Sequence, residues 1–114
     1  MTREPDPAAL DFTGLTATYL NCTLKRSPEP SHTQGLVDAS ADLMRKHGVE
    51  VAVLRPIDHD IATDVCADMR EHGWETDAWP EIYPGILRSD ILVVAGPIWL
   101  GDNSSVTKQV IERL

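Results

Sequence analysis

The run from Ile91 to Ala95, "ILVVA", is the feature that most limits how this chain can fold. An unbroken apolar run without alternation is typical of a strand covered on both faces, as in a parallel sheet flanked by helices. Residues 15–22, "LTATYLNC", combine β-branched, aromatic and small side chains and predict a second buried strand. Residues 49–55, closed by Pro56, predict a third. Three such strands point to a sheet with helices on its faces.

Helical patterns separate the predicted strands. Residues 33–47 repeat apolar side chains near helical spacing, with Ser31 or Thr33 as the candidate cap and Gly48 as the stop. Residues 62–71 allow at most one short helix, and a further helical pattern begins at residue 79 but is limited to about two turns or a kink by Pro84. A final helix follows a cap at Asn103 or Ser104.

The order of elements predicts an α/β fold with a parallel sheet, because strand–helix–strand units cross over with a right hand. Residues 1–14 are expected to form a disordered N-terminal leader, because they are acidic, contain proline and lack the pattern of a signal peptide. Residues 15–114 are expected to form the domain. The apolar third strand would leave an unpaired edge, which predicts the N-terminal portion of a longer α/β domain, truncated after its third βα unit.

Charge and cysteine content exclude several classes of function. Eighteen acidic and ten basic side chains give a formal charge of −8, which disfavours binding to nucleic acid or to a membrane surface. Cys22 and Cys66 show no metal-ligand spacing, so no metal site is expected and a reducing, cytoplasmic setting fits best. No apolar run is long enough to span a membrane.

The loop after the first strand, "NCTLKRSPEPSHT", allows two interpretations of its cysteine. Phosphatases that use a thiolate need Cys-x5-Arg, but Pro28 stands six residues after Cys22 and Arg26 only four. A small buried residue at a strand end is therefore the better interpretation of Cys22.

The hydroxyl groups and cations of the same loop are more informative. Ser31 and Thr33 precede or open a helix whose free N–H groups and dipole favour a bound phosphate, and Lys25 and Arg26 add cations. His32 could add a further donor. The alternative is that the hydroxyls only cap the helix and the cations face water.

A second polar loop, "GPIWLGDNSS", follows the third strand. In a sheet of order 2-1-3, strand order reverses between strands one and three, and ligands of open α/β sheets bind at that point. Trp99 and neighbouring N–H groups suit contact with a flat ring, although a core or interface aromatic is the alternative for Trp99.

With both loops placed, residues 15–114 resemble the flavodoxin-like superfamily and, within it, the NAD(P)H-dependent FMN and quinone reductases. The matching motifs are "NCTLKRSPEPSHT" and "GPIWLGDNSSVTKQVIERL". The resemblance implies that the first loop contacts the FMN phosphate through Thr23, Lys25, Arg26, Ser31, Thr33 and Gln34. It also implies that the second loop lines the isoalloxazine with Pro97, Ile98, Trp99, Leu100 and Gly101.

The function implied by the resemblance is hydride transfer from NAD(P)H through bound FMN to a quinone-like or other small electrophilic acceptor. The flavin carries the chemistry, so no catalytic side chain is named. The resemblance also implies a homodimer or homo-oligomer. Two alternatives stay open: a flavodoxin-type one-electron carrier, and a non-catalytic fragment that does not hold flavin.

Residues 56–78 are acidic and weakly patterned, and we expect a solvated surface excursion rather than a lid over the substrate. Within it, "DHD" at residues 58–60 predicts a polar turn rather than a metal site.

Overall fold

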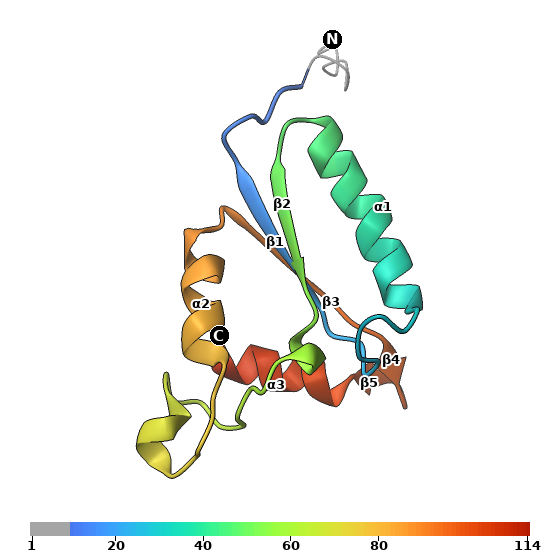
Figure 1. Ribbon diagram of the computed structural model, residues 1–114. Coiled ribbons are helices and arrows are strands. Elements are labelled where there is room, and N and C mark those ends of the chain that lie inside the picture. The colour runs from blue at the N-terminus through green and yellow to red at the C-terminus, as the bar shows by residue number, and fades with distance from the viewer. Residues whose placement is uncertain (1–9) are drawn as a thin grey trace.

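The structure, a computed structural model, describes residues 10–114 (Figure 1). Its elements, in chain order, are β1 (Thr16–Asn21), α1 (His32–Lys46), β2 (Glu50–Leu54), the 3-10 helices η2 (Pro56–Asp58) and η3 (Met69–His72), α2 (Trp79–Arg88), β3 (Ile91–Ala95), β4 (Ile98–Trp99), β5 (Asp102–Asn103) and α3 (Ser105–Arg113). The predicted leader lies mostly outside the described residues. Of its last residues, Phe12 donates its N–H to the His47 carbonyl at 2.7 Å.

The central sheet has the strand order β2-β1-β3 and is parallel throughout. In the register, Tyr19 of β1 lies beside Val53 of β2 and Val93 of β3. The predicted fold class, an α/β flavodoxin-like sheet of order 2-1-3, is therefore confirmed.

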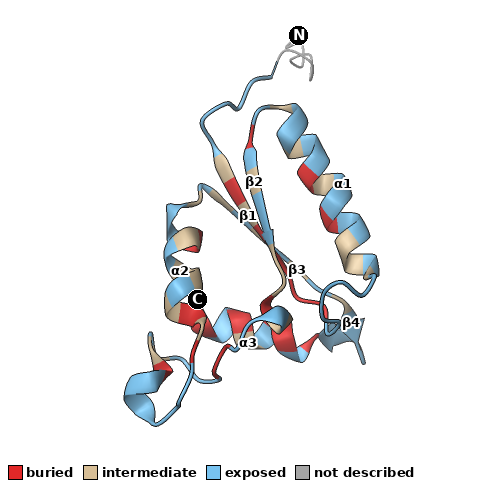
Figure 2. Cartoon of the chain, viewed as in Figure 1, coloured by how far each residue is buried: buried red, intermediate tan, exposed pale blue. Residues whose placement is uncertain are grey.

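Helices cover the two faces of the sheet in separate layers, with α1 on one face and α2 and α3 on the other (Figure 1). Because alternate residues of a strand point to opposite faces, Ala17 and Tyr19 of β1 pack against α1, whereas Leu20 packs with Trp79 and Val110 of the other layer. Buried residues gather on β1 and on the sheet-facing sides of α1 and α3 (Figure 2). β1 thus forms the spine that fixes where its carboxyl end, and the loop after it, must lie.

β3 is covered less completely than its sequence predicts. Leu92 is 38% exposed and Val94 is 36% exposed, so the face that looks toward α2 and α3 is partly open among the described residues. The prediction of a strand covered on both faces was therefore wrong for this part of the chain.

Two serines cap the helices that begin beside the polar loops. The Ser31 hydroxyl accepts the Gln34 N–H at 3.2 Å at the start of α1. The Ser104 hydroxyl accepts the Thr107 N–H at 3.1 Å at the start of α3. Between the candidates in each loop, the structure selects Ser31 over Thr33 and Ser104 over Asn103.

The loop after β3 contains a hairpin that the sequence did not predict. Ile98 pairs with Asn103 and Trp99 with Asp102 in the antiparallel strands β4 and β5. Leu100 and Gly101, the two residues between the strands, have φ values of 52° and 76°. Two positive φ angles at the tip are typical of a type I′ turn, whose twist matches that of the flanking strands.

Most of residues 56–78 are exposed, as predicted for a surface excursion, and residues 62–71 contain only the start of the 3-10 helix η3 rather than an α-helix. The segment is nevertheless fixed to the rest of the chain. The segment is held by a buried ion pair in which Arg113 of α3 donates to Asp77 at 2.7 Å, both side chains being 0% exposed. Asp77 also accepts the backbone N–H groups of Ala62, Met69 and Trp79. Burial alone would raise the pKa of Asp77, but these bonds and Arg113 hold it well below its usual range. The segment is therefore a closed structural unit.

Candidate functional site

The loop after β1, the N-terminus of α1 and the β4–β5 hairpin meet around a cavity of about 200 Å³. It lies beyond the carboxyl ends of β1 and β3, where the strand order reverses (Figure 1). Its lining is Thr23, Leu24, Lys25, Ser31, His32, Thr33, Pro97, Ile98 and Trp99. The two polar loops that the sequence placed at the switch point do meet there.

Most of the predicted phosphate contacts line this cavity, and two do not. Thr23, Lys25, Ser31 and Thr33 are in the lining, whereas Arg26 and Gln34 are outside it. Whether any of these residues binds phosphate stays a prediction.

The amide of Gln34 has structural partners at both ends. Its Oε1 accepts from Asn21 Nδ2 at 2.8 Å, and its Nε2 donates to Asp38 at 2.7 Å. Asn21, which is buried, also accepts the Thr23 N–H at 3.2 Å. The geometry therefore favours a role for Gln34 in shaping the loop, through Asn21, rather than in direct contact.

Backbone N–H groups are the donors that the loop offers most clearly. Among the described residues, no acceptor is found for the N–H groups of Leu24, Arg26, Ser31, His32 and Thr33. All but Arg26 line the cavity. The first turn of α1 also carries no acidic side chain, so nothing opposes the positive end of its dipole.

Leu24 is the lining residue that sequence reasoning missed, because its contribution is a backbone group and its side chain gives no signal. Pro28 and Pro30 have no N–H to donate. The N–H groups without acceptors lie on either side of the two prolines, so the loop keeps its donors.

The hairpin supplies an apolar wall. Pro97, Ile98 and Trp99 line the cavity, while Leu100 and Gly101 form the turn at its tip. Ile98 is 76% exposed and Trp99 is 56% exposed, which excludes the alternative of a core tryptophan. The pair can therefore contact a flat apolar ring that extends out of the cavity.

Short-range bonds hold the hairpin and join it to the first loop. Lys108 of α3 donates to Asp102 at 2.8 Å, and this bond holds the pKa of Asp102 below its ordinary value. The buried Ser104 hydroxyl donates to the Cys22 carbonyl at 2.9 Å. The two loops therefore form one rigid platform.

Gly96, between β3 and the hairpin, is required by close packing. A Cβ at this position would overlap Oγ1 of Thr107 and lie 3.5 Å from Cβ of Cys22. The absence of a side chain lets the end of β3 pass the start of α3 and aim the hairpin at the cavity.

Cys22 is fully buried, and burial raises the pKa of its thiol. A buried neutral thiol is a poor nucleophile. The structure therefore supports the small buried residue predicted from the sequence and not the phosphatase.

Asp58 and Asp60 bond to hydroxyl groups within the chain, of Ser27 and Thr76 respectively. Across residues 10–114, no cluster of three or more His, Cys, Asp or Glu side chains is placed to hold a metal ion.

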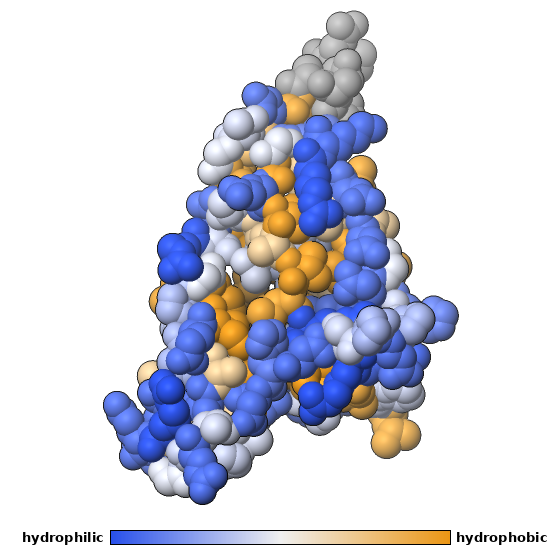
Figure 3. Space-filling view, viewed as in Figure 1, coloured by the Kyte–Doolittle hydropathy of each residue, from blue (hydrophilic) through white to orange (hydrophobic). Residues whose placement is uncertain are grey.

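A cavity of about 470 Å³ also lies between the sheet and α2, where Figure 3 shows apolar surface. Its walls are mainly aliphatic, with Leu20, Leu54, Ile82 and Ile86 among them. Among the described residues no Lys or Arg side chain lines it, and Glu81 adds a carboxylate, so it does not suit a phosphate.

The residues of the smaller cavity fit the phosphate end of FMN. A dianion matches open N–H groups, a helix N-terminus and Lys25 in a chain of net charge −8. The exposed side chains of Ile98 and Trp99 match the flavin ring.

Comparison with known proteins agrees with this fit. The family model of the NADPH-dependent FMN reductases matches residues 19–114, which include both loops. A relative from Streptomyces davaonensis, 8-demethyl-8-aminoriboflavin-5'-phosphate synthase, is 41% identical over 105 residues, which are 88% of this chain and 41% of the relative. Because the family description names both FMN and NADPH, the predicted cofactors are confirmed at the level of the family.

A solved structure gives the same indication. The crystal structure of RosB with the bound intermediate 8-demethyl-8-formylriboflavin-5'-phosphate matches with a TM-score of 0.76 and 40% identity, over 86% of this chain and 41% of that one.

Another relative carries a different description. The divalent metal cation transporter MntH of Mycobacterium bovis is 63% identical over 103 residues, which are 90% of this chain but 15% of the relative. Among the described residues, no helix has the length and apolar character needed to cross a membrane. The chain spans less than half the length of each of these curated relatives.

Proposed function

The chain belongs to the NADPH-dependent FMN reductase family, as its two loop motifs predicted, and we propose that it forms the FMN-phosphate-binding part of a flavin-dependent NAD(P)H oxidoreductase. The observation that carries the proposal is the meeting of both loops at one cavity. There the unpartnered N–H groups of one loop lie opposite the apolar hairpin of the other.

In this proposal the chain binds and orients the flavin. The N–H groups of Leu24, Ser31, His32 and Thr33 hold the phosphate oxygens, and the Lys25 ammonium neutralises part of the phosphate charge. The hydroxyls of Thr23, Ser31 and Thr33 add side-chain donors, and Arg26 remains a candidate contact at the edge of the site.

The β4–β5 hairpin positions the isoalloxazine ring of the flavin. Ile98 and Trp99 cover the isoalloxazine and exclude water from its edge, with Pro97 behind them and Leu100 and Gly101 at the tip. When bound, FMN supplies the hydride chemistry between NAD(P)H and a quinone-like or other small electrophilic acceptor. The chain itself need hold no acid, base or nucleophile.

The oligomer and the compartment belong to the same proposal. The exposed Ile98 and Leu100 at the hairpin give an apolar surface that a second copy could cover, in line with a homodimer or homo-oligomer. Cys22 and Cys66 are both unpaired, which suits a reducing, cytoplasmic setting.

A second candidate is that the flavin is a substrate rather than a resident cofactor. The observation that favours it is the 40% identity to RosB, whose crystal structure holds a riboflavin-5'-phosphate derivative described as an intermediate. The same phosphate cradle serves both candidates, since both retain the phosphate of the flavin.

Adding FMN to the purified chain and following the flavin spectrum tests the proposal, first in the dark and then with NADPH in the absence of air. A bound flavin that NADPH bleaches supports the reductase. A bound flavin that is unchanged by NADPH supports the one-electron carrier. A flavin whose absorbance spectrum does not return to that of FMN when air is readmitted supports the substrate candidate. A chain that does not bind FMN overturns all three.

A further inference from the structure

Arg55, which follows β2, contacts the loop after β1 from the side. Its Nη1 donates to the carbonyl oxygen of Lys25 at 3.1 Å and to that of Glu29 at 2.9 Å. Arg55 is half-buried, and the two carbonyls that it bridges lie on either side of Pro28, with Pro30 directly after the second. One guanidinium thus closes the proline-containing stretch into a ring.

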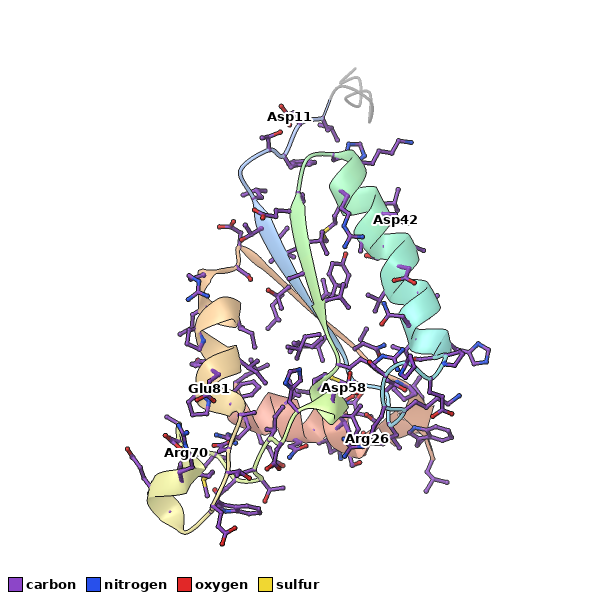
Figure 4. The ribbon with its side chains drawn as sticks, in the orientation of Figure 1. Asp11, Arg26, Asp42, Asp58, Arg70 and Glu81 are labelled. Atoms are coloured by element: carbon purple, nitrogen blue, oxygen red, sulfur yellow. The ribbon has the colours of Figure 1, made fainter. Side chains whose placement is uncertain are left out.

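Asp58, in η2, holds the middle of the same stretch. Its Oδ1 accepts the Ser27 N–H at 2.8 Å, and its Oδ2 accepts the Ser27 hydroxyl. Figure 4 shows Asp58 and Arg26 at the same end of the sheet. These bonds hold the pKa of Asp58 below its ordinary value, so the carboxylate is ionised at neutral pH.

The direction of the Arg55 bonds has a consequence for the donors. In a planar trans peptide the C=O and the next N–H point in opposite directions. Because the Lys25 carbonyl points to Arg55, the Arg26 N–H points away from it. This N–H has no acceptor among the described residues and belongs to a residue next to the cavity lining, between Lys25 in the lining and Ser27 on Asp58. Arg55 also binds carbonyl oxygens whose negative partial charge would otherwise repel a phosphate.

We propose that Arg55 and Asp58 form a clamp of positioning residues that holds residues 24–30 in the shape that presents N–H groups to a flavin phosphate. This inference rests on the proposed function and adds to it two residues outside both loop motifs. It explains how a loop with two prolines keeps a phosphate cradle.

The first test measures hydrogen–deuterium exchange in the flavin-free chain. In Arg55→Ala and Asp58→Ala, the bonded amides of residues 24–30, those of Lys25, Ser27 and Glu29, should exchange several-fold faster than in the wild type, while α1 and β3 stay unchanged. Arg55→Lys should restore part of the protection, because an ammonium can still donate to a carbonyl. Unchanged exchange in residues 24–30 overturns the clamp.

The second test compares FMN with riboflavin, which lacks the phosphate, by flavin fluorescence. Loss of a charge-assisted contact to the loop should weaken FMN binding about tenfold in Arg55→Ala and Asp58→Ala. Riboflavin binding should change less than about twofold, since only the phosphate cradle is disturbed. Arg45→Ala and Glu112→Ala remove exposed charges elsewhere and serve as matched controls.

The outcomes separate the two claims. If the wild type binds FMN and both variants bind it equally well, the clamp is overturned but the proposed function stands. The same holds if the variants lose affinity for FMN and for riboflavin equally. A wild-type chain that binds neither flavin overturns the proposed function and the inference with it.

Discussion

Two polar segments begin where the first two strands of the sheet end, and they treat their polar groups in opposite ways. Residues 56–78 direct a carboxylate and two backbone N–H groups toward one buried centre, where Asp77 meets Arg113 at 2.7 Å and also accepts the N–H of Trp79 from α2. The loop after β1 and the first turn of α1 together leave five N–H groups without an acceptor among the described residues. The first segment uses its polar groups in contacts within the chain, whereas the second keeps donors that suit a ligand.

The comparison teaches that polarity alone does not mark a site. By composition the acidic segment looked like a possible lid. Trp74 within it is 45% exposed, whereas Trp79, the first residue of α2, is 1% exposed and stacks on Tyr83. What distinguishes the loop after β1 is the set of N–H groups without acceptors next to a cavity. The following predictions test that distinction.

The largest effect is expected at the buried ion pair. Asp77→Ala leaves Arg113 buried without its partner and should lower the free energy of unfolding by about 3–5 kcal/mol, measured by urea denaturation. Glu75→Ala, an exposed acidic residue of the same segment, should stay within about 0.5 kcal/mol of the wild type. The folded fraction of Asp77→Ala should bind FMN as the wild type does. A loss below about 1 kcal/mol would mean that the pair does not hold the segment.

Acid should weaken the same centre. The folded pKa of Asp77 lies below its ordinary value of 3.8, so its contribution to stability is present above that value and is lost as the pH falls below it. The free energy of unfolding, followed by denaturation between pH 6 and about pH 2, should therefore fall more steeply in the wild type than in Asp77→Asn. Parallel curves for the two proteins would contradict the predicted role of this carboxylate.

The platform under the hairpin should tolerate no added methyl group. Gly96→Ala forces a Cβ into Thr107 Oγ1 and should cost about 1–3 kcal/mol in thermal or urea denaturation. Because the clash involves that hydroxyl, Gly96→Ala combined with Thr107→Ala should be more stable than the sum of the two single losses. Strict additivity would show that Gly96 is required for another reason.

The phosphate loop should respond in affinity rather than in stability. His32 is the first residue of α1, a position that proline favours. Ser31 before it is extended, with φ −133° and ψ 131°, as the residue before a proline prefers, so a proline at residue 32 fits the backbone. His32→Pro removes one open N–H and should weaken FMN binding by three- to tenfold, with the free energy of unfolding within about 0.5 kcal/mol of the wild type.

His32→Ala is the matched control for this variant, because it removes the imidazole but keeps the N–H. If His32→Ala weakens FMN binding as much as His32→Pro, the side chain and not the backbone is the contact. Calorimetry or fluorescence titration distinguishes the two.

The fold was largely predictable because its signals are local. The apolar runs located the three sheet strands within about one residue at each end, and Gly48, with φ 90°, ends α1 as expected. The hairpin was missed because Leu100 adopts a left-handed conformation, which a leucine in the sequence does not predict.

The candidate site was predictable only in part. The loop motifs identified seven of the nine lining residues, whereas Leu24 contributes through its backbone and His32 was considered only as a possible extra donor. The contacts from Asp77 to Arg113 and from Arg55 to Lys25 join residues 36 and 30 positions apart, and neither has a local pattern in the sequence. Long-range polar pairs of this kind decide which loop is closed and which stays open.

The central claim is that the loop after β1 binds the flavin phosphate through open backbone donors. An NMR titration of the isotope-labelled chain with FMN tests it directly, since each amide reports separately. The account predicts large shifts for Leu24, Arg26, Ser31, His32 and Thr33, much smaller ones with riboflavin, and none at the amides of Ala62 and Met69 that bond to Asp77. Shifts confined to residues 56–78 or to the aliphatic cavity beside α2, or the same response to both flavins, would contradict it.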